Sequence, residues 1–147
     1  MAAVSRSATA QWQGTTSEGA GHITFGSGAF SGPYDLKARI EDEPSATNPE
    51  EMIAAASAGC FTMALSSMLE EEGTPAESLE TVGRARLEQK EEGFRITRIT
   101  LTLAGVVPGI TEEHFLELAG RAEKTCPVSI ALAGTEIVLR ASLAQGS

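Results

Sequence analysis

The two cysteines of this chain, Cys60 and Cys126, carry the side chains best suited to nucleophilic chemistry. Cys126 directly precedes Pro127, the first residue of a short helix predicted over "PVSIAL". It therefore lies at a helix cap, where backbone N–H groups and the positive end of the helix dipole favour a thiolate over a thiol. Such a cysteine is either a reactive or resolving thiol or a small residue that fits a tight helix junction, and the pattern alone leaves both interpretations open.

Cys60 lies in the interior of a predicted long helix, about ten residues from its start, where the dipole has little effect. Next to Ala58 and Phe61 it resembles an ordinary buried thiol, and a thiol in apolar surroundings is inert. A reactive Cys60 needs a cation nearby. Arg39 is a candidate because a guanidinium stays charged and can hold a thiolate and a substrate oxygen together. Glu50 can orient Arg39 through a bidentate ion pair.

Both charged residues also have ordinary interpretations. Arg39 can be a surface charge at the end of a strand, and Glu50 can complement the dipole at the helix start. Glu50 and Cys60 lie about 15 Å apart along one straight helix, so they cannot touch there. If both serve one site, either the chain before the helix folds back or a second copy supplies the acid.

The long helix is apolar on nearly every side, which is typical of a buried helix. It needs more cover than one small sheet provides. We therefore expect a homodimer with the two long helices packed at its centre.

The composition excludes several classes of partner. With 20 acidic and 11 basic residues the net charge is -9, which disfavours nucleic acid and anionic lipid surfaces. The longest apolar stretch, Met52 to Leu69, is interrupted by polar residues, and the N-terminus lacks the apolar core of a signal peptide. The two cysteines and two histidines lack the spacing of a metal site. We expect a cytoplasmic protein without a membrane partner, metal or other cofactor.

The chain is organised as one domain, 1–147, of class α+β. Its pattern predicts the order βββ-α-ββ-α-α-β, with a slip in the fifth strand near Thr97-Arg98. The predicted elements are strands at 11–13, 22–25 and 34–40, a helix capped by Asn48, or by Thr47 in a capping box with Glu50, and running to about Glu72, a hairpin over 82–103, a helix capped by Thr111, the short helix after Cys126, and a last strand at "TEIVLRASL".

The chain resembles the OsmC/Ohr family of thiol peroxidases, and within it the OsmC-like branch, over nearly its whole length. The resemblance is carried by "TNPEEMIAAASAGCFTMALS" (47–66), by "VPGI" before the second long helix and by "KTCPVSIAL" (124–132). In "KARIEDEPSATNPEE", Arg39 precedes Glu50 at the spacing expected of this family. The resemblance implies antiparallel sheets wrapped around long central helices in an intertwined homodimer.

The resemblance also implies reduction of organic hydroperoxides without metal, haem or flavin. Carried over by position, Cys60 is the peroxidatic thiolate, Cys126 the resolving thiol, Arg39 the group that stabilises the thiolate and Glu50 the group that orients Arg39. The Cys60 sulfenic acid condenses with Cys126 to a disulfide, and an external dithiol, lipoyl-linked in many relatives, reduces it.

The chain departs from the family pattern at two positions, and two alternatives to the peroxidase function remain. Many relatives carry histidine where this chain has Ser57 and alanine where it has Gly59, which leaves the substrate preference open. The same cysteines could serve a thiol–disulfide oxidoreductase that consumes no peroxide. They could also be packing residues of a non-catalytic, stress-related dimer.

Overall fold

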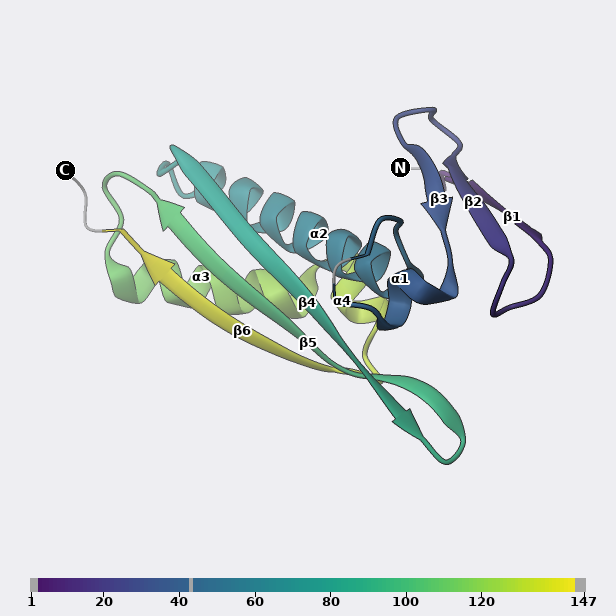
Figure 1. The fold of residues 1–147 in the computed structure, drawn as a ribbon. Coiled ribbons are helices and arrows are strands. Elements are labelled where there is room, and N and C mark those ends of the chain that lie inside the picture. The colour runs from purple at the N-terminus through teal and green to yellow at the C-terminus, as the bar shows by residue number, and fades with distance from the viewer. Residues whose placement is uncertain (1–2, 43, 145–147) are drawn as a thin grey trace. The chain divides into compact units, whose positions relative to one another are not determined.

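The computed structural model describes residues 3–42 and 44–144 of the chain (Figure 1). The chain divides into two compact units, Met1–Met52 and Ile53–Ser147. Two separate sheets of three strands each and four helices make up the described part, so the predicted α+β class is confirmed.

The first unit contains an antiparallel meander with the strand order β1-β2-β3. Its strands are β1 (Ala8–Gln13), β2 (Ala20–Phe25) and β3 (Ser31–Tyr34). Trp12 and Tyr34 pack on the sheet with their ring centroids 5.5 Å apart. The meander predicted from the glycine-punctuated segments is therefore present.

The third strand was expected to run over 34–40, and this prediction is wrong. The strand ends at Tyr34, and the short helix α1 (Leu36–Ile40) follows. Asp35 is the physical reason, because its carboxylate accepts a hydrogen bond from the Ala38 N–H at 2.7 Å and caps the helix. Arg39 consequently lies in a helix and not at the end of a strand.

The helix α2 (Pro49–Glu71) begins in the first unit and continues through the second. Of the two predicted caps, Asn48 and Thr47, Asn48 caps the helix, with its Oδ1 accepting from the Glu51 N–H at 2.8 Å. At the other end Gly73 adopts a φ of 79°, and the Thr74 N–H donates to the Leu69 carbonyl at 2.9 Å. A left-handed glycine after the last turn is a common helix terminator.

The second unit is built on the hairpin of β4 (Ser78–Lys90) and β5 (Gly93–Val106). Arg86 pairs with Arg98, but Leu87 pairs with Ile96, so Thr97 has no partner in the ladder. This bulge confirms the slip predicted near Thr97-Arg98.

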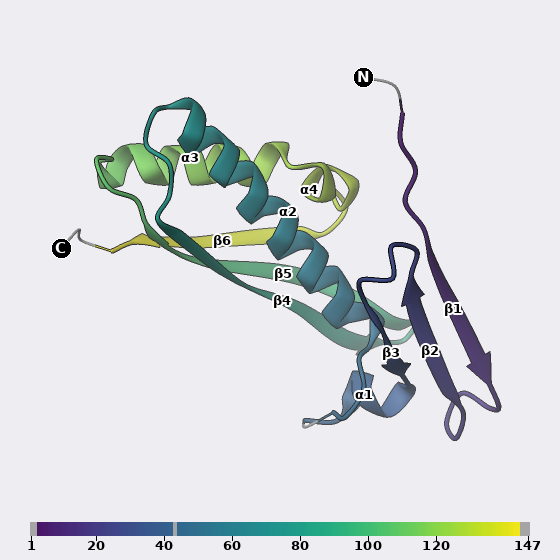
Figure 2. The same ribbon diagram turned by 90° about the horizontal axis from the view of Figure 1, so that it is seen from above.

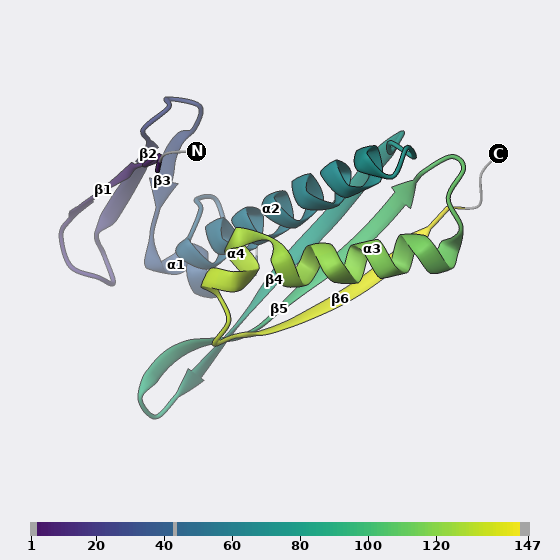
Figure 3. The same ribbon diagram turned by 180° about the vertical axis from the view of Figure 1, so that it is seen from behind.

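The last strand, β6 (Glu136–Leu143), pairs with β5 in parallel, so the second sheet is mixed and not antiparallel as expected. The connection between the two strands contains α3 (Glu112–Thr125) and α4 (Pro127–Ala131). These helices carry the chain back to the end of the sheet at which β5 started, and a strand that begins there must run parallel. Within this unit α2 and α3 lie on the same face of the sheet (Figures 2 and 3).

The core of the second unit lies between this face and the two helices. Its fully buried side chains come from α2, β5 and α3: Phe61, Leu65, Leu69, Ile99, Leu101, Leu103, Phe115 and Leu118. By length and composition alone α2 could span a membrane, but one of its faces supplies core residues.

Another flank of α2 is exposed. It carries Ala55, Ala56, Gly59 and Met63, whose side chain is 75% exposed. A helix expected to be buried all round is therefore covered on one side only in the single chain.

Candidate active site

Cys126 occupies the cap of α4, as its position before Pro127 predicts. Its sulfur accepts from the Ser129 N–H at 3.4 Å, and its thiol donates to the Ser129 hydroxyl at 3.1 Å. Cys126 is only 1% exposed. The thiol is therefore held in one place by its own helix.

Cys60 lies on α2 and is partly exposed, and both cysteines are free thiols. Burial raises the pKa of the Cys60 thiol above its ordinary value, the backbone N–H of Val128 partly offsets this by donating to the sulfur, and the neighbouring Cys126 raises the pKa further. Because Cys126 is close enough to shift the pKa of Cys60, the fold of the second unit brings together two cysteines that lie far apart in the sequence.

Arg39 and Glu50 form an ion pair within the first unit. The Arg39 Nε lies 3.1 Å from one carboxylate oxygen of Glu50 and 3.3 Å from the other. The side chains are 29% and 12% exposed, so the pair is partly shielded from water. Glu50 pairs with Arg39, and the adjacent Glu51 accepts a hydrogen bond from the Thr47 hydroxyl at 2.7 Å.

Local hydrogen bonds explain why these two residues meet. Asn48 caps α2 with its side-chain oxygen, and its side-chain nitrogen donates to the Ala38 carbonyl at 2.8 Å. One buried amide thus ties the end of α1 to the start of α2. Arg39 follows Ala38, and Glu50 lies two residues after Asn48. The hydrogen bond between Asn48 and Ala38 therefore brings the guanidinium close to the carboxylate.

Ser129, which no sequence motif singled out, is 6% exposed and contacts the Cys126 sulfur with both its hydroxyl and its N–H. Its position three residues after the cap was the available signal, because the N–H at that position is the usual partner of a capping side chain. Ser57, noted only as a departure, is fully buried, and its hydroxyl has no hydrogen-bond partner among the described residues.

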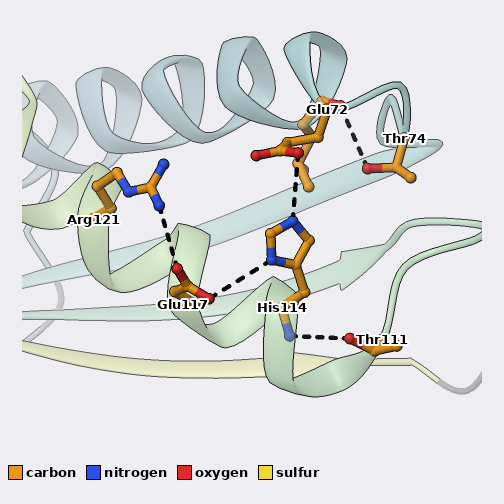
Figure 4. A network of polar contacts seen from close by, with 7 residues as sticks. Glu72, Thr74, Thr111, His114, Glu117 and Arg121 are labelled. Carbon is orange, nitrogen blue, oxygen red and sulfur yellow. Dashed lines mark hydrogen bonds and ion pairs between the residues drawn. The ribbon is translucent and has the colours of Figure 1, made fainter.

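A second polar cluster joins the end of α2 to α3 (Figure 4). The His114 ring lies 3.6 Å from the Glu72 carboxylate and 3.7 Å from that of Glu117, which also pairs with Arg121 at 3.3 Å. The Thr111 hydroxyl accepts from the His114 N–H at 3.1 Å, so Thr111 caps α3 as predicted. In the described part of the chain, no three or more His, Cys, Asp and Glu residues are placed to hold a metal ion.

Comparison with known proteins identifies the family. The sequence model of the OsmC-like proteins matches residues 41–140. This chain belongs to the OsmC family. It is 41% identical to peroxiredoxin OsmC of Escherichia coli K12 over 121 residues, which are 82% of this chain and 84% of that protein.

The Ohr branch and the solved structures give the same result. The chain is 31% identical to the organic hydroperoxide resistance protein OhrB of Bacillus subtilis over 115 residues, 78% of this chain and 83% of that protein. The crystal structure of OhrB superposes with a TM-score of 0.68, covering 92% of this chain and 98% of OhrB. An OsmC-like protein of unknown function from Vibrio cholerae is 18% identical and superposes with a TM-score of 0.77. The superposition covers 95% of this chain and 100% of the Vibrio protein. The OsmC/Ohr fold expected from the motifs is confirmed, while a single domain over 1–147 stays a prediction.

Proposed function

We propose that this OsmC-family chain is a cysteine-based peroxidase that reduces organic hydroperoxides to alcohols. The relatives named as a peroxiredoxin and as an organic hydroperoxide resistance protein support a peroxidase-type redox role. The observation that carries the finer proposal is the contact between the Cys60 and Cys126 thiols inside one compact unit. Two thiols in contact can form a disulfide once either is oxidised.

In the proposed reaction the Cys60 thiolate attacks one oxygen of the hydroperoxide. The O–O bond breaks, and the alkoxide takes a proton and leaves as alcohol, while Cys60 becomes a sulfenic acid. The Cys126 sulfur then attacks the Cys60 sulfur, and the hydroxyl leaves as water. An external dithiol, of the lipoyl type in our proposal, reduces the disulfide and is itself oxidised to a disulfide.

Arg39 and Glu50 complete the proposed site. Burial and Cys126 both raise the pKa of Cys60, so the thiolate needs a stabilising cation. We assign this role to Arg39, because a guanidinium remains charged even when it is partly buried. Glu50, whose two oxygens lie at the Arg39 Nε, orients the guanidinium.

The proposed protein is a homodimer in the cytoplasm and acts without a metal or another cofactor. The exposed apolar flank of α2 supports a second copy as its cover, because a stripe of small apolar residues and a methionine is costly to leave in water. A reducing compartment supports the chemistry, since there the two thiols are regenerated after each cycle.

The test measures the loss of an alkyl hydroperoxide in the presence of a dithiol. We expect turnover by the wild-type chain and none by Cys60→Ser, with an intramolecular Cys60–Cys126 disulfide on intact-mass and peptide spectra after one equivalent of peroxide. Loss of peroxide no faster than without protein would instead favour a thiol–disulfide oxidoreductase. Two cysteines that both resist oxidation would favour the non-catalytic dimer.

A further inference from the structure

The surroundings of the two thiols differ. The Cys126 residue is 1% exposed, whereas Cys60 is partly open to solvent. A thiolate that opens a disulfide must reach one sulfur from the side opposite the leaving sulfur, so access selects the sulfur that is attacked. Within the single chain, the Cys60 sulfur is therefore the more accessible of the two.

The groups around the Cys126 sulfur are arranged to receive charge. In the reduced protein the Cys126 thiol donates to the Ser129 hydroxyl at 3.1 Å, while the Ser129 N–H donates to the sulfur at 3.4 Å. A hydroxyl can accept from a thiol and, after a rotation of its hydrogen, donate to a thiolate. Ser129 can therefore hold Cys126 in both protonation states without a movement of the backbone.

These contacts belong to the product of disulfide reduction, because both cysteines are free thiols in this structure. The leaving sulfur gains negative charge as the S–S bond breaks, and donors already placed at its final position stabilise that charge. Ser129 is 6% exposed, so little water competes for the sulfur.

We infer that the external dithiol opens the disulfide at Cys60, and that Cys126 leaves as a thiolate which Ser129 receives. The inference rests on the proposed peroxidase cycle and adds the direction of its reductive half. One sulfur of the dithiol bonds to the Cys60 sulfur, the bond between Cys60 and Cys126 breaks, and its electron pair stays on Cys126.

The second thiol of the reductant then completes the exchange. It attacks the reductant's own sulfur in the mixed disulfide, which releases the Cys60 thiolate and an oxidised, cyclic disulfide. The two protons lost by the dithiol balance the two that the departing cysteine sulfurs take up. Ser129 is thus a catalytic group for reduction, and the attack of Cys60 on the peroxide does not involve it.

The first experiment locates the attacked sulfur in the wild-type protein. The disulfide is made with diamide, which joins neighbouring thiols without peroxide, so the result does not depend on peroxidase activity. A monothiol is added, the reaction is stopped with acid, free thiols are alkylated and peptides are mapped by mass spectrometry. We expect the monothiol adduct on Cys60 and the alkyl group on Cys126. Adducts mainly on Cys126 would overturn the inference.

The second experiment measures the role of Ser129 by stopped flow, with dithiothreitol as the dithiol. We expect Ser129→Ala to slow reduction of the diamide-made disulfide about tenfold, as for loss of a hydrogen bond to a charged group, with the rate of Cys60 oxidation unchanged. Ser142→Ala is the matched control, because Ser142 donates to the Leu103 carbonyl at 3.3 Å in the same unit. An unchanged reduction rate in a folded Ser129→Ala protein would overturn the role of Ser129. If that variant does not fold, the adduct map alone decides the direction of attack.

Discussion

At the scale of single residues, the chemistry depends on how Cys60 is kept ionised. Within the second unit the two effects that raise its pKa, burial and the adjacent Cys126 thiol, act against one N–H donated by Val128. The thiolate is the reactive form, so these neighbours alone leave Cys60 a poor nucleophile at neutral pH. The proposed role of Arg39 follows from this deficit.

Replacing Arg39 by Ala tests that role. Without the cation the pKa of Cys60 stays above its ordinary value, so the thiolate fraction is small at neutral pH and grows as the pH rises through that pKa. We expect the second-order rate with an alkyl hydroperoxide to fall about tenfold or more at pH near 7 and to approach the wild-type rate in alkaline solution. Stopped-flow rates against pH, with the ultraviolet absorbance of the thiolate, give the measurement.

Arg98→Ala provides the control for this prediction. Arg98 forms an exposed ion pair with Glu136 between β5 and β6, so its loss removes one positive charge without touching the proposed site. Its pH profile should match that of the wild-type chain. If the pH–rate profile of Arg39→Ala also matched that of the wild type, Arg39 would have no role in stabilising the Cys60 thiolate.

At the scale of elements, the long helix reaches its sheet through a contact that only glycine permits. A Cβ on Gly83 of β4 would lie 2.6 Å from the Ala54 carbonyl oxygen and 3.2 Å from the Ala58 Cβ, both on α2. The helix backbone therefore packs directly on the strand. This approach fixes the height of α2, and with it Cys60, above the sheet of its own unit.

We expect Gly83→Ala to destabilise the protein by about 1–3 kcal/mol, because the new methyl group forces the helix away from the strand. Urea unfolding followed by circular dichroism measures the change. Gly120→Ala in α3 is the matched control: nothing lies within 4 Å of its Cβ, and alanine in a helix interior should stabilise by up to about 1 kcal/mol. Equal stability of Gly83→Ala and wild type would contradict the close contact.

At the scale of the whole molecule, the apolar flank of α2 is the feature that a single chain does not explain. Met63 is 75% exposed beside Ala55, Ala56 and Gly59, although the opposite face of the same helix is fully buried. In addition, β4 is an edge strand of its sheet. An uncovered apolar helix next to an open edge favours association between copies.

We expect the wild-type chain to be a dimer at micromolar concentration and Met63→Glu to be largely monomeric, because the new carboxylate would be buried in the interface. Sedimentation equilibrium or light scattering measures the masses. Leu116→Glu is the control, since Leu116 is an apolar residue of α3 that is 41% exposed outside this flank, and its variant should stay dimeric. A monomeric wild-type chain would contradict the proposed dimer and any active site that shares residues between two copies.

The sequence by itself determined the features that depend on neighbours a few residues away. Asn48, Thr111 and Cys126 cap the helices at which they were expected, and the bulge falls at Thr97. In each case a side chain binds a backbone group within the next turn, or a change in the alternation of apolar residues marks the break. Asp35 gave an equally local signal, but the apolar residues after it resemble a strand and concealed the short helix α1.

Only the tertiary structure decided which distant residues meet. The parallel pairing of β6 with β5 depends on the path of two intervening helices, and the contact between Cys60 and Cys126 depends on how α4 packs near α2. The exposed flank of α2 was also invisible in the sequence, where the helix is apolar on nearly every side. Non-local pairings of this kind depend on burial summed over the whole unit, and no short stretch of the chain encodes that sum.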